Sequence, residues 1–262
     1  MDYQNLRYEV ADGVATIALD RPGAANAIDL ALARELMQVA IRCDEDPRVR
    51  AVLLTGVGKM FCVGGDLKAF AAHGDALPSL LKEITTNLHA ATSRWARMAA
   101  PLVVAVNGTA AGAGFSLAIA GDLVVMAESA KLTMAYTAAG LSPDGSSTWY
   151  LPRLVGMRRA QELMLTNRRL SAAEALDWGL VNQVVPDAEL AGTAMALAKQ
   201  LAAGPTRAFG EVKKLLASTF NESLETQMEL EARGIAAMAR GEDGREGIAA
   251  FVAKRAPKFS GR

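Results

Sequence analysis

The sequence predicts an α/β protein with one large core and a helical C-terminal appendage. Strand and helix signals alternate along the first two thirds of the chain, and glycine-rich segments join several of them. The last third carries helical patterns with few strand signals. A chain of 262 residues is long enough for one large or two small domains, and its evenly scattered apolar residues favour a single core.

Composition excludes several classes of function. The 28 basic and 28 acidic side chains balance, so nothing points to nucleic acid or an anionic membrane as a main partner. No apolar run is long enough to span a bilayer, and the start, MDYQNLRYEV, lacks the order of a signal peptide. Cys43 and Cys62 make no disulfide framework, and with His73 and His89 they give no metal-ligand spacing. We therefore expect a reduced, cytoplasmic protein without a metal centre.

The N-terminal segment predicts a hairpin and then a helix. Two strand-like runs within residues 6–19 flank an Asp-Gly pair that is typical of tight hairpin turns. Asp29 can cap a helix whose apolar residues recur at helical spacing until Pro47 stops it. A buried strand is expected over residues 49–55.

A glycine-rich loop follows, with the sequence GVGKMFCVGGDLKAF. Asp66 is expected to cap a short helix that begins at Leu67. Residues 73–79 have a loop-like composition, and after them apolar residues at helical spacing predict a long helix that ends before Pro101.

Residues 101–127 are the stretch around which the rest is organised. A buried strand over Leu102–Val106 leads through Asn107 and Gly108 to Gly112-Ala113-Gly114 and into an apolar helix. Small residues at such a junction let the backbone approach a ligand closely, and the first N–H groups of the helix have no partner inside it. Those donors suit a developing negative charge.

The remaining elements end in a helical region. A short strand is expected over residues 131–134, then a turn-rich loop over 140–145, a capping box at Ser171 and a strand over 181–185. Three helices are expected, over residues 190–203, 206–218 and 224–239. Their apolar faces predict that they cover the core or form a subunit interface.

Five segments, in this order, resemble the enoyl-CoA hydratase/isomerase or crotonase superfamily: FCVGGDL, NGTAAGAGFSLAIAGDLVV, GLSPDGSSTWYLPRLVG, RRLSAAEALDWGLVNQVV and FVAKRAPKFSGR. The resemblance covers nearly the whole chain. It implies a ClpP/crotonase-like spiral of strand-strand-helix units over residues 1–200 and a helical trimerisation region over 201–262. It also implies a homotrimer or dimer of trimers that acts on acyl-CoA thioesters, with coenzyme A as part of the substrate and no permanently bound cofactor.

The family's motifs place an oxyanion hole at the backbone amides of Gly65 and Ala113. Two fixed N–H donors would stabilise the negative charge that a thioester oxygen gains, each by roughly 2.7 to 4 kcal/mol. The resemblance also implies contacts to coenzyme A from Ala24, Ala25, Ala27, Val63, Gly64, Asp66 and Leu67. Arg21 and Lys68 are candidates to meet its phosphates, as are Lys254 and Lys258 from a neighbouring subunit, although a solvated basic tail would explain the last two as well.

The catalytic side chains depart from those of the hydratases. The two positions where that subgroup carries glutamates hold Ser116 and Tyr136 here. Adding water to a double bond by the hydratase route needs one group to activate water and another to deliver a proton, so we expect hydratase activity to be weak or absent.

Asp144 is the remaining candidate acid/base. An aspartate in Pro-Asp-Gly is often just a turn former. However, the loop GLSPDGSSTWYLPR resembles that of crotonase-like isomerases similar to ring-epoxide phenylacetyl-CoA isomerases, in which an aspartate moves a proton. A single carboxylate can take a proton from one carbon and return it to another, so double-bond isomerisation is the favoured hypothesis.

Besides enoyl-CoA hydration, two alternatives stay open. VGMRRAQELMLTNRRL resembles 4-chlorobenzoyl-CoA dehalogenases, which implies Asp144 as nucleophile and His89 as base, but Tyr136 stands where that group has a tryptophan. Taken alone, His89 is better explained as an exposed helical histidine. The second alternative is a protein that binds acyl-CoA and has lost the chemistry.

Overall fold

Two β-sheets organise the chain in the computed structural model, which describes residues 3–262. The larger sheet has six strands in the order β1 (Leu6–Ala11), β2 (Val14–Leu19), β3 (Ala51–Gly56), β5 (Leu102–Val106), β7 (Leu123–Ala127), β10 (Gln183–Val185). The smaller sheet has four, in the order β4 (Met60–Cys62), β6 (Thr109–Ala111), β8 (Lys131–Thr133), β9 (Leu170–Ser171).

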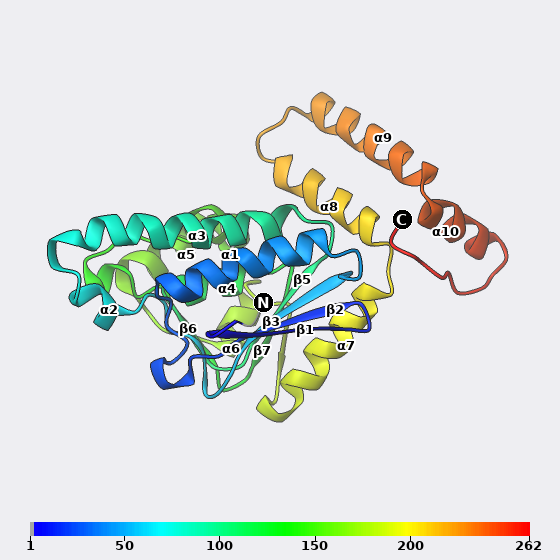
Figure 1. Ribbon diagram of the computed structural model, residues 1–262. Helices are drawn as coiled ribbons and strands as arrows, with labels where there is room; N and C mark the ends of the chain where they lie inside the picture. Colours follow the sequence, from blue (N-terminus) through cyan, green and yellow to red (C-terminus); the bar gives the residue numbers. More distant parts are fainter. Residues whose placement is uncertain (1–2) are drawn as a thin grey trace.

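The chain alternates between the two sheets in repeated strand-strand-helix units. β3 and β4, β5 and β6, and β7 and β8 each place one strand in either sheet, and each pair leads into a helix. Within a sheet these strands pair in parallel, whereas β1 with β2 and β8 with β9 are antiparallel. The expected α/β spiral is therefore present (Figure 1).

Local signals in the sequence account for several of these elements. β1 and β2 form an antiparallel hairpin in which every residue is paired, from Leu6 opposite Leu19 to Ala11 opposite Val14. Asp29 caps α1 (Leu30–Glu45) by accepting a hydrogen bond from the Leu32 amide at 2.8 Å. Asp66 caps α2 (Leu67–Ala71), and Ser171 opens α6 (Ala172–Asp177) with a complete capping box. Each cap satisfies amides that the helix itself leaves unpaired.

Other expectations were wrong in detail. Residues 74–76 form a 3₁₀ turn and α3 (Leu77–Arg97) begins directly after it, because proline at 78 is tolerated in the first turn of a helix. The strands β4 and β6 were missed, since three residues are too few to show an alternating pattern. Beyond α7 (Leu190–Ala202), α8 (Thr206–Ser218) and α9 (Leu224–Arg240) lies a further helix, α10 (Glu242–Val252), which was not predicted.

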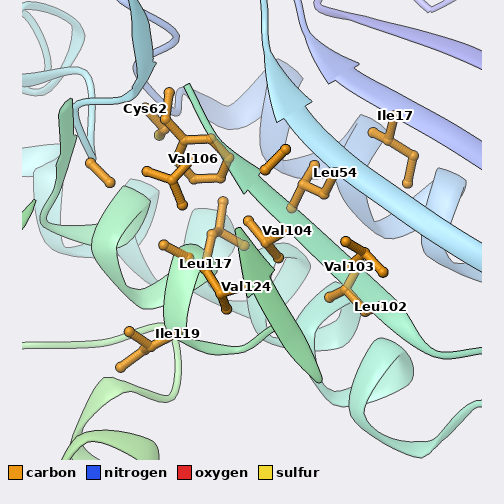
Figure 2. Packing of buried hydrophobic residues seen from close by; sticks show 14 of the residues in the cluster. Ile17, Leu54, Cys62, Leu102, Val103, Val104, Val106, Leu117, Ile119 and Val124 are labelled. Carbon is orange, nitrogen blue, oxygen red and sulfur yellow. The ribbon is translucent and has the colours of Figure 1, made fainter. Parts of the chain in front are cut away.

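The core lies where both sheets meet α4 (Ala113–Ile119). Every residue of β5 and of α4 is buried. Figure 2 shows side chains of β2, β3, β5, β7 and α4 in one cluster, among them Val104 of β5 and Leu117 of α4. A helix that is apolar all round, as α4 is, must be enclosed on every side.

The C-terminal arm, defined as α8 to α10, extends away from the two sheets in Figure 1. Arg50, at the start of β3, ties its two ends to the core: its guanidinium donates to the carbonyl of Gly204 at 2.6 Å and to that of Phe259 at 2.9 Å. The division of the chain at residue 200 stays a prediction. Helix α7 packs against β3, β5 and β7 and ends at Ala202, so this helix of the core runs just past that position.

The first turn of α4 lies directly against strand β4. A Cβ on Gly114 would be 2.0 Å from the carbonyl oxygen of Cys62, a distance that no structure tolerates. The absence of a side chain at Gly114 therefore sets how closely α4 approaches the smaller sheet. Within residues 3–262, no helix combines the length and the apolar character needed to cross a membrane.

Gly114→Ala tests this close approach. The added methyl group must push α4 away from β4, so the free energy of unfolding should fall by about 3 kcal/mol or more in urea titrations followed by circular dichroism. Gly192→Ala is the matched control, because nothing lies within 4 Å of the Cβ it would gain on α7. It should leave stability unchanged or raise it by up to about 1 kcal/mol. Equal stability of the two variants would contradict the packing argument.

Candidate active site

A cavity of about 290 Å³ opens where the two glycine-rich segments meet α3 and the loop after β8. Gly65, Ala113 and Asp144, which the sequence analysis singled out, all line it. Most of the wall is apolar and comes from Ile28, Val63, Leu67, Phe70, Leu81, Ile84, Leu88, Ala135, Ala139 and Leu141. The cavity can therefore enclose an apolar group next to two backbone amides and one carboxylate.

The backbones of residues 63–65 and 111–113 are in contact. A Cβ on Gly64 would lie 2.8 Å from the carbonyl oxygen of Ala111 and 3.2 Å from the amide nitrogen of Ala113. Gly64 and Gly112 both have positive φ, at +93° and +52°, a conformation that favours glycine. These two glycines bring the segments of Gly65 and Ala113 together.

The amides of Gly65 and Ala113 are both available to a ligand. Neither donates a hydrogen bond to any acceptor within residues 3–262. Ala113 is the first residue of α4, where the helix offers no internal partner. Because both residues line the cavity, the pair can donate to one oxygen placed there.

The segments predicted to hold coenzyme A run side by side. The Ile28 amide donates to the Gly64 carbonyl at 2.7 Å, and the Asp66 amide donates to the Ile28 carbonyl at 2.9 Å. Of the seven predicted contact residues, Val63 and Leu67 line the cavity. The others lie in the same two segments but outside the cavity lining: Ala24, Ala25, Ala27, Gly64 and Asp66.

The predicted phosphate contacts differ in their surroundings. Arg21 is already engaged, because its guanidinium lies 2.8 Å from Asp29 Oδ2 and 3.3 Å from Asp66 Oδ2. Because two carboxylates already pair with this guanidinium, its attraction for a phosphate is reduced. Lys68, Lys254 and Lys258 are exposed to solvent.

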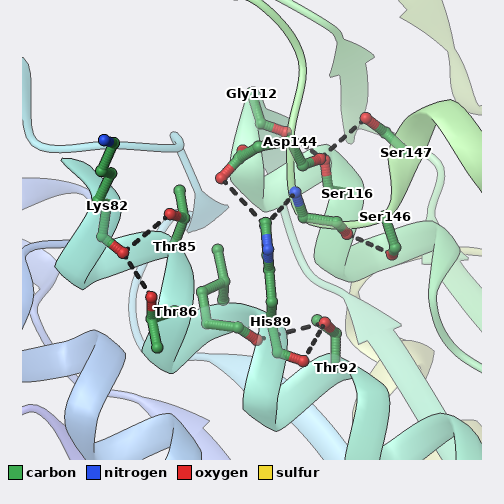
Figure 3. A network of polar contacts seen from close by, with 12 residues as sticks. Lys82, Thr85, Thr86, His89, Thr92, Gly112, Ser116, Asp144, Ser146 and Ser147 are labelled. Carbon is green, nitrogen blue, oxygen red and sulfur yellow. Dashed lines mark hydrogen bonds and ion pairs between the residues drawn. The ribbon is translucent and has the colours of Figure 1, made fainter. Parts of the chain in front are cut away.

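Asp144 lines the cavity and belongs to a network of polar contacts (Figure 3). The Tyr136 hydroxyl donates to its Oδ1 at 2.5 Å. Its backbone carbonyl accepts from the hydroxyls of Ser116 at 2.9 Å and Ser147 at 3.0 Å. Both serines are fully buried, whereas the Asp144 side chain is 24% exposed. The network therefore holds the turn firmly and leaves part of the carboxylate open.

His89 projects from α3 toward this carboxylate (Figure 3). Its Nε2 lies 3.1 Å from the Gly145 amide and 3.6 Å from Asp144 Oδ2. Because an amide can only donate, Nε2 must offer a lone pair here, which places the proton of the neutral ring on Nδ1. The structure thus brings His89, expected as either a base or an exposed helical residue, to the rim of the site.

Tyr136 stays protonated in this setting. Burial raises the pKa of its phenol far above the ordinary value, and the negative charge of Asp144 adds to the shift.

Positive φ angles at Ala135 (+55°), Gly145 (+63°) and Ser146 (+78°) flank the Tyr136 and Asp144 positions. Such backbone conformations are costly outside glycine and gather at functional sites.

Asn26 is a supporting residue that the sequence analysis missed. It is completely buried, and its amide donates to the carbonyls of Met60 at 2.8 Å and Val57 at 3.0 Å. Its Oδ1 accepts from the Arg21 amide at 2.9 Å. An asparagine in a run of small residues looks like a loop residue, and nothing in the sequence marks it as buried. It locks the segment of residues 24–28 onto the glycine-rich loop.

Comparison with known proteins identifies the class to which this fold and site belong. The enoyl-CoA hydratase/isomerase family model matches residues 9–262. The chain therefore belongs to the enoyl-CoA hydratase/isomerase family, whose members act on CoA thioesters, and the resemblance noted in the sequence is confirmed.

Three relatives differ in the reactions that their names give. A probable enoyl-CoA hydratase of Rhodobacter capsulatus is 42% identical over 100% of both chains. The 1,2-epoxyphenylacetyl-CoA isomerase of Escherichia coli K12 is 40% identical over 97% of both. The 4-chlorobenzoyl coenzyme A dehalogenase-2 of an Arthrobacter species is 36% identical over 95% of this chain and 91% of its own.

The solved structures confirm the fold. A putative enoyl-CoA hydratase from Streptomyces coelicolor A3(2) superimposes with a TM-score of 0.93 at 33% identity, covering 100% of this chain and 96% of its own. The expected crotonase-like α/β fold with a helical C-terminal region is thus correct.

Replacing Asn26 should loosen the attachment of residues 24–28 to the glycine-rich loop. Asn26→Ala leaves several buried carbonyls without a donor, so the free energy of unfolding should fall by about 2 to 3 kcal/mol in urea titrations. Asn87→Ala is the control, since that amide makes just one bond on the surface of α3, to the Glu83 carbonyl. It should change stability by less than about 0.5 kcal/mol. A similar small change for both would show that Asn26 does not anchor the segment.

Proposed function

We propose that this protein isomerises the double bond of an enoyl-CoA thioester. The observation that carries the proposal is the chemistry of the cavity wall: Asp144 is the one carboxylate that lines it among the described residues. The two positions with glutamates in the hydratases hold the hydroxyls of Ser116 and Tyr136. A single carboxylate is sufficient to move one proton between two carbons.

In the proposed reaction, the thioester oxygen accepts hydrogen bonds from the amides of Gly65 and Ala113. Asp144 takes a proton from the carbon between the carbonyl and the double bond. As that C–H bond breaks, its electron pair moves into the conjugated system and the thioester oxygen becomes an enolate, which the two amides stabilise. Asp144 then returns the same proton to the far carbon of the former double bond, and the carbonyl re-forms. Atoms and charges balance without any co-reactant.

Hydration is less well supported. It requires a second group to activate water, and the hydroxyls of Ser116 and Tyr136 are already engaged with Asp144. The 40% identity to an epoxyphenylacetyl-CoA isomerase supports an isomerase, although the 42% identical relative carries the name of a hydratase.

A second candidate is hydrolytic dehalogenation of an aryl-CoA. His89 Nε2 lies 3.6 Å from Asp144 Oδ2. Asp144 could attack the ring carbon that carries chlorine and expel chloride, and His89 could then activate water to hydrolyse the aryl ester, which releases the hydroxyaryl-CoA and the free carboxylate. The departure of Tyr136 from the dehalogenase tryptophan weighs against this reaction. A protein that binds acyl-CoA without turnover is the remaining alternative.

Asp144→Asn tests the role of this carboxylate, and a panel of three substrates separates the candidate functions. The variant keeps its shape but cannot take a proton, so turnover of a 3-enoyl-CoA should fall by at least about 10³-fold while acyl-CoA binding in calorimetry changes little. Wild-type protein is assayed in parallel with 3-enoyl-CoA, 2-enoyl-CoA and 4-chlorobenzoyl-CoA. Asp177→Asn, at an exposed acid of α6 outside the cavity lining, is the control and should retain full activity.

Each outcome of that panel is decisive. Turnover of 3-enoyl-CoA alone supports isomerisation, whereas turnover of 2-enoyl-CoA or 4-chlorobenzoyl-CoA alone replaces it with hydration or dehalogenation. Thioester binding with no turnover favours a binding protein. Full activity of Asp144→Asn removes Asp144 from the mechanism.

We further propose that the chain forms a homotrimer or a dimer of trimers through residues 201–262. The arm exposes large apolar side chains that a solitary subunit would leave in water: Val212, Leu216, Phe220, Leu224, Met228, Ile235, Ile248, Phe251 and Val252. Burying such residues is the usual driving force for association.

Light scattering after size exclusion tests the assembly. The chain of 27.6 kDa should elute at about three or six times that mass. Replacing Phe251, which is 85% exposed, by glutamate should lower the mass toward that of the monomer. A wild-type protein that is monomeric at micromolar concentration contradicts the proposal.

A further inference from the structure

The two oxygens of the Asp144 carboxylate have different surroundings. Oδ1 accepts the short hydrogen bond from the Tyr136 hydroxyl, at 2.5 Å. Oδ2 accepts no hydrogen bond from the described residues, and His89 Nε2 lies 3.6 Å from it. Since that nitrogen accepts from the Gly145 amide, it has no proton to give to Oδ2. Within the described residues, Oδ1 is therefore held by a donor and Oδ2 is free.

Tyr136 is itself fixed in place. Its ring packs against the hydrophobic core, and its hydroxyl lies 3.0 Å from Ser116 Oγ. Ser116 Oγ can donate either to this hydroxyl or to the Asp144 carbonyl, 2.9 Å away. In both arrangements the proton of Tyr136 is left for Oδ1, because a donor prefers an ionised carboxylate to a neutral hydroxyl.

The phenol can serve as a donor throughout the neutral pH range. Burial and the adjacent negative charge raise its pKa well above the ordinary value, so it keeps its proton. A donor 2.5 Å from Oδ1 therefore holds that oxygen of the ionised carboxylate throughout this range.

We propose that Tyr136 is a positioning residue for Asp144: it holds Oδ1 through its hydroxyl and leaves Oδ2 as the oxygen that takes and returns the substrate proton. The inference rests on the proposed role of Asp144 in isomerisation. Tyr136 fixes the rotation of the carboxylate before substrate binds. The proton moves between substrate carbon and Oδ2, and Tyr136 never gives up its own.

Tyr136→Phe tests the inference, since it removes the hydroxyl and keeps the ring. The kcat for 3-enoyl-CoA should fall about 10- to 100-fold while KM changes less than about threefold, because positioning is lost and binding is not. An unchanged kcat, or a rise in KM that accounts for the whole loss of kcat/KM, overturns the proposal.

Ser147→Ala is the matched control. It also removes one buried hydroxyl that contacts Asp144, but that hydroxyl binds the backbone carbonyl instead of the carboxylate. It should lower the melting temperature, but with a smaller loss of kcat than Tyr136→Phe, because the carboxylate keeps its donor. A loss of kcat in Ser147→Ala equal to that in Tyr136→Phe would reduce Tyr136 to a structural role.

Carbon-13 NMR of the aspartate carboxyls at neutral pH tests the same point without turnover. The signal missing from Asp144→Asn identifies Asp144, and its chemical shift should change in Tyr136→Phe because Oδ1 loses its donor. An unchanged chemical shift contradicts the inference even if no substrate is turned over. Conversely, an inactive Asp144→Asn beside a fully active Tyr136→Phe rejects the positioning role and leaves the proposed function intact.

Discussion

The structure depends on the close approach of backbone to backbone at two glycines. Gly64 lies against the chain at Ala111 and Ala113, and Gly114 lies against Cys62, at distances that leave no space for a Cβ. These contacts join the smaller sheet to the first turn of α4 and fix the amides of Gly65 and Ala113 near each other. Because the donors belong to the backbone, their placement is a property of the fold and requires no particular side chain.

Ser116, where the hydratases have a glutamate, packs against the turn that carries Asp144. Ser116 is fully buried, and its Oγ is 3.0 Å from the Tyr136 hydroxyl. A Cβ on Gly145 would be 2.9 Å from the Cβ of Ser116. A glutamate at this position would need the space that Tyr136 and the turn of Asp144 and Gly145 occupy. The small residue at 116 and the turn that presents Asp144 are therefore one arrangement, which leaves no room for a glutamate at 116 beside Tyr136.

Much of the fold could be predicted because its signals are local. The caps at Asp29, Asp66 and Ser171 and the buried strand at 102–106 are each set by a few neighbouring residues. The short strands β4 and β6 could not be found, since their pairing depends on residues far apart in the sequence. For the same reason the burial of Asn26 and the bond from Tyr136 to Asp144 stayed hidden. The positions of Gly65, Ala113 and Asp144 came from the family resemblance, and their roles stay predictions.

The fold alone does not determine the reaction. Relatives at 42% and 40% identity carry the names of a hydratase and an isomerase, so overall similarity does not choose between them. An oxyanion site that is built from backbone stabilises charge on any thioester oxygen, whichever bond is formed or broken next. The choice then falls to the few side chains whose protons can reach the substrate. Here the carboxylate with one oxygen bound by Tyr136 and the other free is suited to moving a single proton back and forth, which is the chemistry of a double-bond shift.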